Sequence, residues 1–155
     1  MPYISGNLSL SIQISGLMSS LQKDWPSLSC PSSDGFRFWS HEWIKHGTCA
    51  VSEEIGQHVY FEAALKLKKK ANLLQALISA GIKPDGESYD LDSIRLAIKE
   101  ATGFTPDIEC NTDASKNRQV YQVFMCADIS GSEFIECPVP LKKRCKSNKV
   151  HFPEF

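Results

Sequence analysis

Apolar side chains recur with a helical period along much of the chain and change to an alternating pattern near its end. Spacings of three and four between apolar residues predict five helices, over 14–21, 36–46, 57–70, 72–80 and 91–101. β-branched and aromatic residues then alternate with polar ones, which predicts three strands, over 119–127, 133–137 and 149–152. Helices followed by strands, with no repeat and no linker, predict one α+β unit.

Proline and glycine mark the expected boundaries. Trp25-Pro26 should end the first helix, and Gly47 should stop the second. Residues 29–35 are rich in Ser and form an expected loop, and Ser130-Gly131-Ser132 is an expected hairpin turn. The lysines at the end of the third helix suit its dipole as a solvated last turn, with a phosphate contact as the alternative.

Composition excludes several classes of protein. The 155 residues include 42% apolar and 23% charged side chains, as in an ordinary globular domain, and the net charge is −1. A strongly basic nucleic-acid binder is therefore excluded, so local groups must hold any polyanionic substrate. No stretch approaches the roughly 20 apolar residues of a membrane span, and we expect no membrane partner.

Six cysteines stand out in a chain of this size: Cys30, Cys49, Cys110, Cys126, Cys137 and Cys145. An even number fits an oxidised protein of the secretory route, and the alternative is six buried free thiols. No pair has the C-x-x-C spacing of a metal knuckle, so a metal is disfavoured. The N-terminal residues argue the other way, because they lack the basic start and unbroken apolar run of a convincing signal peptide.

Residues 36–49, FRFWSHEWIKHGTC, hold the densest functional signal. At about 100° per residue, one arc of about 140° holds four ionisable side chains, those of His41, Glu42, Lys45 and His46. Phe38 falls inside the arc and adds an exposed ring, whereas Trp39 and Trp43 lie beyond its edge and should anchor the helix in the core.

Three interpretations compete for this helix. His41-Glu42 begins like the H-E-x-x-H of zinc proteases, but His46 is five positions on and would splay by about 140°. A structural interpretation takes it as a buried aromatic helix with solvated His and Lys. We favour an acid–base site for a phosphate, in which Lys45 neutralises phosphate oxygens and His46 carries a proton. Such a site needs no metal and suits RNA, whose 2′-OH can be the nucleophile.

The segment FWSHEWIKHGTC resembles the second active-site segment, H-E-W-x-K-H-G-T-C, of the ribonuclease T2 family. WPSLSCPS before it, the Y-F-E-A-A-L helix after it, the segment near Thr105-Pro106 and the C-terminal cysteines resemble plant S-like ribonucleases of this family. The resemblance covers about 14–155. It implies an α+β fold, with an antiparallel sheet and several helices, and a metal-independent endoribonuclease without a cofactor.

The resemblance also implies roles for individual residues. His46 would be the general base for the 2′-OH, while Glu42 and Lys45 would stabilise the pentacoordinate phosphate. His41 would bind phosphate, and Phe38 would line a base site. The product would be a 2′,3′-cyclic phosphate and then a 3′-phosphate. The substrate would be single-stranded RNA, the protein a monomer, and its location extracellular, vacuolar or otherwise secretory.

One family segment has no counterpart in this sequence. Family members carry an earlier H-G-L-W-P segment whose histidine is the general acid, but none of the four histidines here is followed by Gly-Leu-Trp. We interpret residues 1–13 as a divergent leader and 14–155 as a partial domain without the N-terminal strands. We therefore expect impaired activity, with a catalytically inactive RNA-binding or interaction remnant as the alternative.

The resemblance also divides the six cysteines. It implies the disulfides Cys110–Cys145 and Cys126–Cys137. Cys30 and Cys49 would lack their family partners, so they either pair with each other or stay free. In the inactive alternative, the basic residues Lys142, Lys143, Arg144 and Lys146 could contact phosphate weakly, although a solvated loop is the simpler interpretation.

Overall fold

The computed structural model describes residues 13–29, 34–48, 56–139 and 144–155. The chain divides into two compact units. The N-terminal unit comprises residues up to 69 together with 129–132, and the C-terminal unit comprises residues 70–128 and 133–155. Each unit has its own hydrophobic core, so each is described by itself.

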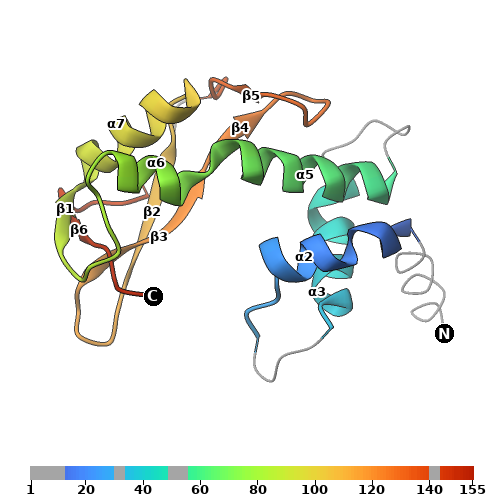
Figure 1. The fold of residues 1–155 in the computed structure, drawn as a ribbon, viewed down its shortest axis with the longest axis horizontal. Coiled ribbons are helices and arrows are strands. Elements are labelled where there is room, and N and C mark those ends of the chain that lie inside the picture. The colour runs from blue at the N-terminus through green and yellow to red at the C-terminus, as the bar shows by residue number, and fades with distance from the viewer. Residues whose placement is uncertain (1–12, 30–33, 49–55, 140–143) are drawn as a thin grey trace. The chain divides into compact units, whose positions relative to one another are not determined.

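The N-terminal unit is helical (Figure 1). Its elements are η1 (Ser15–Leu17), α2 (Met18–Asp24), α3 (Phe36–Glu42), η2 (Trp43–Gly47) and α5 (Gln57–Ala71), whose end enters the other unit. Ile14, Leu21, Trp39 and Phe61 are fully buried at its centre. The indole Nε1–H of Trp39 donates to the carbonyl of Trp25 at 2.9 Å, which ties α3 to the end of α2.

The C-terminal unit packs helices on a sheet (Figure 1). Its helices are α6 (Leu73–Ser79) and α7 (Leu91–Thr102), and its strands are β1 (Ser88–Asp90), β2 (Asp107–Thr112), β3 (Arg118–Phe124), β4 (Cys126–Ala127), β5 (Phe134–Ile135) and β6 (Lys149–His151). Four strands form a sheet in the order β1-β6-β3-β2, and β4 pairs with β5. The pairing is antiparallel except between β3 and β6, so the sheet is mixed.

The predicted spacing of α7 is found in its packing. Leu91, Ile94, Ala97 and Ile98 are buried in one cluster with Ile108 of β2 and other apolar side chains. Gly103 ends the helix with a φ of +85°, a conformation that glycine adopts at low cost, and its N–H bonds to the carbonyl of Lys99.

A register shift interrupts the long β2–β3 pairing. Glu109 pairs with Gln122, but Cys110 pairs with Val120, so Tyr121 is the extra residue of a β-bulge. Val120 and Val123 consequently both pack against the core although they are three positions apart. Tyr121 lies between them in the sequence and is 57% exposed.

Both disulfides that the family resemblance implies are present. Cys110–Cys145 has an S–S distance of 1.99 Å and joins β2 to the segment before β6. Cys126–Cys137 has an S–S distance of 2.03 Å and closes the chain around the β4–β5 pair. Cys30 and Cys49 lie outside the described residues, so their pairing stays a prediction.

The sequence patterns located all five helices and part of the sheet. The expected strand over 119–127 is divided into β3 and β4, and the expected strand over 133–137 is limited to β5. β1 and β2 were not predicted. The predicted divergent leader falls almost wholly outside the described ranges, so the proposed domain boundaries stay predictions.

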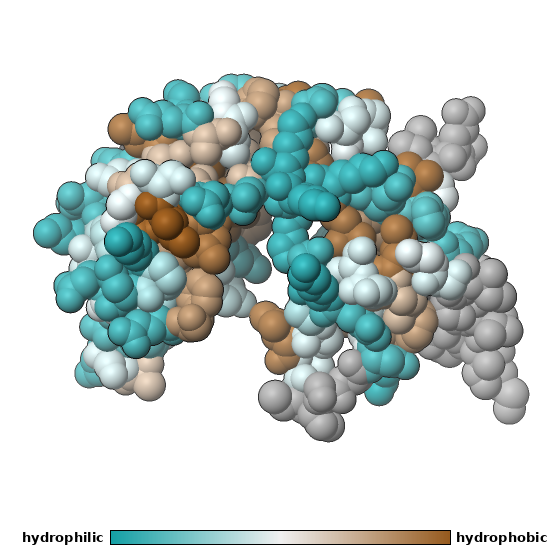
Figure 2. All heavy atoms as spheres, in the orientation of Figure 1, coloured by the Kyte–Doolittle hydropathy of each residue, from teal (hydrophilic) through white to brown (hydrophobic). Residues whose placement is uncertain are grey.

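Hydrophilic residues cover much of the face shown in Figure 2, and apolar side chains reach it at separate places. The most exposed large apolar residues of the described ranges include Leu28, Ile129 and Phe155. None of the helices in these ranges combines the length and the apolar character needed to cross a bilayer.

Candidate active site

The predicted site lies where α3 changes its helical pitch. α3 begins after Gly35, and the N–H of Phe36 donates to Oδ1 of Asp34 at 3.1 Å. From Trp43 to Gly47 the chain forms a π-helical turn, η2, which the N–H of Thr48 closes on the carbonyl of Trp43. The hydroxyl of Thr48 donates to the carbonyl of Ile44 at 3.0 Å and supports the same turn. π turns are rare and are frequent at functional sites.

The π turn changes the angles that an α-helical wheel predicts. Hydrogen bonds to the fifth residue widen the turn, so the rotation per residue falls below the α-helical value. His46 therefore lies closer in azimuth to His41 than the about 140° calculated for an α-helix. The four ionisable residues still come from one continuous helical segment, which fixes their backbone positions.

The basic side chains of this segment face solvent. The side chains of His41, Lys45 and His46 are exposed, and Glu42 is half-buried. Among the residues that the structure describes, the side chains of these three basic residues have no hydrogen bond or ion pair with one another or with a neighbour. Lys66 and Lys68 of α5, by contrast, pair with Glu62 and Asp24.

Glu42 acts electrostatically on a residue that the sequence did not single out for this site. Burial raises the pKa of the Tyr60 phenol, and the charge of Glu42 raises that pKa further. Tyr60 belongs to α5, so its side chain approaches α3 and η2 from a different helix. Only its place on the apolar side of α5 was visible in the sequence.

The aromatic residues of the segment divide as predicted, with one difference. Trp39 is fully buried and Trp43 packs against the same core. Phe38 was expected to be an exposed ring, but it is half-buried and meets the ring of Trp25 edge-on, with 6.3 Å between centroids. Its role in base binding stays a prediction.

Gly47 does not act as the expected helix stop. It lies inside the π turn and is buried, and its φ is outside the left-handed region. A Cβ at this position would stand 2.3 Å from Cε3 of Trp43. Glycine is therefore required here because the Trp43 ring occupies the space of a side chain.

The basic residues of the C-terminal unit are placed differently from those of the site. The Nε of Arg144 pairs with Oδ2 of Asp107 at 3.1 Å, and its Nη1 pairs with Glu109 at 3.6 Å. Its guanidinium also lies 4.4 Å from the centroid of the Phe124 ring. The expected solvated loop therefore contains a structural ion pair at Arg144, and Lys142 and Lys143 lie outside the described residues.

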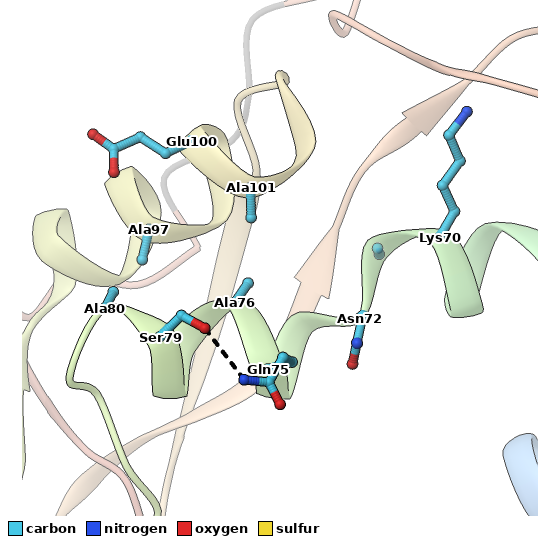
Figure 3. Close-up of a pocket in the computed structure, with 10 residues that line it drawn as sticks. Lys70, Asn72, Gln75, Ala76, Ser79, Ala80, Ala97, Glu100 and Ala101 are labelled. Atoms are coloured by element: carbon cyan, nitrogen blue, oxygen red, sulfur yellow. Dashed lines mark hydrogen bonds between the residues drawn. The ribbon is translucent and has the colours of Figure 1, made fainter.

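A cavity of about 490 Å³ lies in the C-terminal unit and includes none of the predicted site residues. Ala76 of α6 and Ala80 at the C-cap of that helix face Ala101 and Ala97 of α7 there (Figure 3). The remaining lining residues are Lys70, Ala71, Asn72, Gln75, Ser79 and Glu100. In the described part of the chain, no group of three or more His, Cys, Asp or Glu side chains could hold a metal ion.

The sequence profile described as Ribonuclease T2 family matches residues 6–137 of this chain. The chain therefore belongs to the ribonuclease T2 family, and its α+β fold agrees with that membership.

Several curated relatives are highly similar. Ribonuclease 3 of Arabidopsis thaliana is 58% identical over 144 residues, which are 93% of this chain and 64% of that protein. The extracellular ribonuclease LE of Solanum lycopersicum is 56% identical, with 92% of this chain and 62% of that protein covered. The intracellular ribonuclease LX of the same plant is 53% identical, with 92% and 60% covered. The chain thus spans less than two thirds of the length of these relatives.

A solved structure gives the same result for the fold. The crystal structure of RNase NT in complex with 5′-AMP superposes with a TM-score of 0.86 at 51% sequence identity. The match covers 94% of this chain and 70% of that chain.

Proposed function

We propose that this chain acts on single-stranded RNA as a T2-type endoribonuclease that forms a 2′,3′-cyclic phosphate. The observation that carries the proposal is the set of solvent-facing basic side chains of His41, Lys45 and His46 beside Glu42 on one ordered helical segment. Membership of the ribonuclease T2 family supports the same assignment. A phosphodiester is the anion that such a segment suits best, because a fixed cation stabilises the charge that develops on it.

Each site residue has a step in the proposed reaction. His46 accepts the proton of the 2′-OH, and the 2′-oxygen attacks phosphorus. Lys45 and Glu42 stabilise the pentacoordinate phosphorane, and His41 holds the phosphate. The bond to the 5′-oxygen breaks, and this leaving oxygen needs a proton from a general acid. Phe38 lines the base site beside the reacting phosphate.

The leaving-group proton is the weak point of this chain. None of its four histidines precedes Gly-Leu-Trp, the family context of the general acid. A positioned acid contributes about 10²–10⁴ in rate. We therefore propose that this chain, acting alone, cleaves RNA more slowly by about that factor.

Cleavage of a short single-stranded RNA to its cyclic phosphate, followed by chromatography, tests this assignment. We expect slow formation of the product, its loss in His46→Ala, and little change in His58→Ala. His58 is the matched control because its Nδ1 contacts the carbonyl of Gln13, 2.9 Å away, and it is not one of the site residues. Equal rates in wild type and His46→Ala would contradict the assignment.

The second candidate is an inactive remnant that binds RNA or another partner. The absent Gly-Leu-Trp context favours it. RNA binding that Lys45→Met weakens, without any cyclic phosphate product, would decide for the remnant. A rate equal to that of a full-length relative, abolished by His46→Ala, would instead reject impairment and retain the enzyme.

We propose an oxidising compartment on the secretory route for the mature chain. Its two disulfides support this, since such bonds persist in secreted proteins and are rare in the cytosol. The relatives are named both extracellular and intracellular, so their names do not select one destination. A monomeric mass in light scattering would agree with the monomer that we propose.

A further inference from the structure

Two contacts hold the indole ring of Trp43 at the π turn. A Cβ on Gly47 would stand only 2.3 Å from the Cε3 of this ring, so the ring lies directly against the backbone of the turn. The Tyr60 ring meets it edge-on, with centroids 5.5 Å apart and an interplanar angle of 68°. Trp43 thus connects η2 to α5 through one aromatic pair.

Tyr60 is itself held in place by the core of the N-terminal unit. Its ring lies 5.2 Å from that of the fully buried Phe61 and 6.4 Å from that of Trp25, centroid to centroid. Edge-to-face aromatic pairs stabilise one another beyond the burial of their area. Tyr60 and Trp43 therefore connect the buried core of this unit to the π turn.

This connection matters because a π turn needs outside support. The α-helix is the ordinary continuation of α3, and a π turn persists where surrounding contacts favour it. Lys45 and His46 lie within the turn, whereas Glu42 lies just before it. A change of pitch between Trp43 and Gly47 would move both cations relative to Glu42.

We propose that Tyr60 is a positioning residue for the site: its ring holds Trp43 and thereby keeps Lys45 and His46 in fixed relation to Glu42. The inference deepens the proposed function and rests on it, since it assigns a role to a residue outside the H-E-W-x-K-H-G-T-C segment. Misplacement of reacting groups by about 1 Å can lower a rate by about 10²-fold.

Three variants test the role. Tyr60→Leu removes the ring, Tyr60→Phe keeps the ring and removes the hydroxyl, and Phe61→Leu is a matched loss of an aromatic ring from the same core. Phe61 packs against Tyr60 and Trp25. We expect Tyr60→Leu to lower kcat for RNA cleavage about 10- to 100-fold with KM changed less than about threefold. Tyr60→Phe should keep the wild-type kcat, and Phe61→Leu should lose activity only in proportion to its unfolded fraction.

A second readout needs no catalysis. We expect Tyr60→Leu to shift the amide resonances of residues 43–47 and the titration of the His46 imidazole in NMR spectra, and Phe61→Leu to leave both near their wild-type values. If wild type cleaves no RNA, the proposed function fails, and these spectra alone still decide whether Tyr60 positions the turn.

Three results would overturn the proposal. The first is a His46 titration and turn resonances in Tyr60→Leu that match those of Phe61→Leu. The second is a kcat loss in Phe61→Leu as large as in Tyr60→Leu at equal folded fraction. The third is a kcat loss in Tyr60→Phe equal to that in Tyr60→Leu, which would move the role from the ring to the hydroxyl. If Tyr60→Leu does not fold, Tyr60→Met replaces it in all comparisons.

Discussion

The two units use their charged side chains in different ways. In the C-terminal unit, Arg144 forms an ion pair with the buried Asp107. The carboxylate of Glu136 accepts hydrogen bonds from the hydroxyl and from the backbone N–H of Thr105. On the α3–η2 segment of the N-terminal unit, Lys45 and His46 face water, and the structure gives them no partner among the described residues. Charges bonded to ordered groups hold a fold together, whereas unpaired cations on an ordered helix remain available to an anionic ligand.

The units also differ in their cross-links. Both disulfides of the described residues lie in the C-terminal unit, and the core of the N-terminal unit depends on packed aromatic rings. In this comparison the disulfides and ion pairs of the C-terminal unit stabilise its fold, and the exposed basic side chains of the α3–η2 segment are the ligand-binding groups that we propose. Four measurements test this difference between the units.

The largest expected effect follows loss of the longer disulfide. Cys110–Cys145 closes a separation of 35 residues, and the chain-entropy relation gives about 4 kcal/mol of stabilisation for a loop of that length. We expect the double variant Cys110→Ala with Cys145→Ala to lose about that much free energy of unfolding in urea. A loss below about 1 kcal/mol would show that burial and ion pairs alone hold β2 to β6.

A matched pair of charge removals tests the comparison directly. Arg144→Met leaves the buried carboxylate of Asp107 without its cation, so we expect a loss of about 1–3 kcal/mol in the free energy of unfolding. Lys45→Met should change that free energy by no more than about 0.5 kcal/mol, as an exposed substitution does. It should instead lower RNA cleavage about 10²-fold. A large loss of stability in Lys45→Met, together with a small one in Arg144→Met, would contradict the comparison.

The Gly47–Trp43 contact predicts a steric conflict of similar or smaller size. Gly47→Ala places a Cβ 2.3 Å from the Trp43 ring, so we expect about 1–3 kcal/mol of destabilisation. In a double-mutant cycle, Trp43→Leu should remove most of the additional loss caused by Gly47→Ala. Additive losses in urea unfolding would show that the ring does not cause the conflict.

The smallest expected effect is a pH dependence at Glu136. Hydrogen bonds from the Thr105 side chain and backbone N–H hold the pKa of this exposed carboxyl below its ordinary value. The folded-state pKa is thus lower than that of the unfolded chain, and the resulting stability is present above the unfolded pKa and is lost as pH falls through the folded one. Thr105→Val should reduce this acid-side loss in thermal unfolding measured between about pH 3 and pH 6. An unchanged pH profile would show that the hydrogen bond between Thr105 and Glu136 does not contribute to stability.

The sequence predicted the parts of the fold that depend on local pattern. α7 was located because four apolar residues at helical spacing end at a glycine. β2 was not located, because the sequence DIECNT mixes buried and half-buried positions without alternation. Its strand conformation depends on pairing with β3 and on the disulfide from Cys110, both of which are distant in sequence.

The candidate site likewise has a part that the local sequence predicts and a part that depends on tertiary contacts. The wheel brought His41, Glu42, Lys45 and His46 together because they lie on one helical segment. It did not find the π turn, since no residue preference within the segment specifies one and the contact between Trp43 and Gly47 involves tertiary packing. Tyr60 was missed for a related reason, because only the folded chain brings α5 beside Trp43.

The β-bulge at Tyr121 limits how the length of β3 can vary. Val120 and Val123 both reach the core because one additional residue stands between the two paired stretches. Deleting Tyr121 would leave the two valines two positions apart, so a regular strand would still direct both to the core. If Tyr121 were instead drawn into regular pairing, the two valines would point to opposite faces and one would turn to solvent. The bulge thus lets β3 contain one residue more than β2 pairs with, and a deletion at Tyr121 should be tolerated better than a deletion inside either paired stretch.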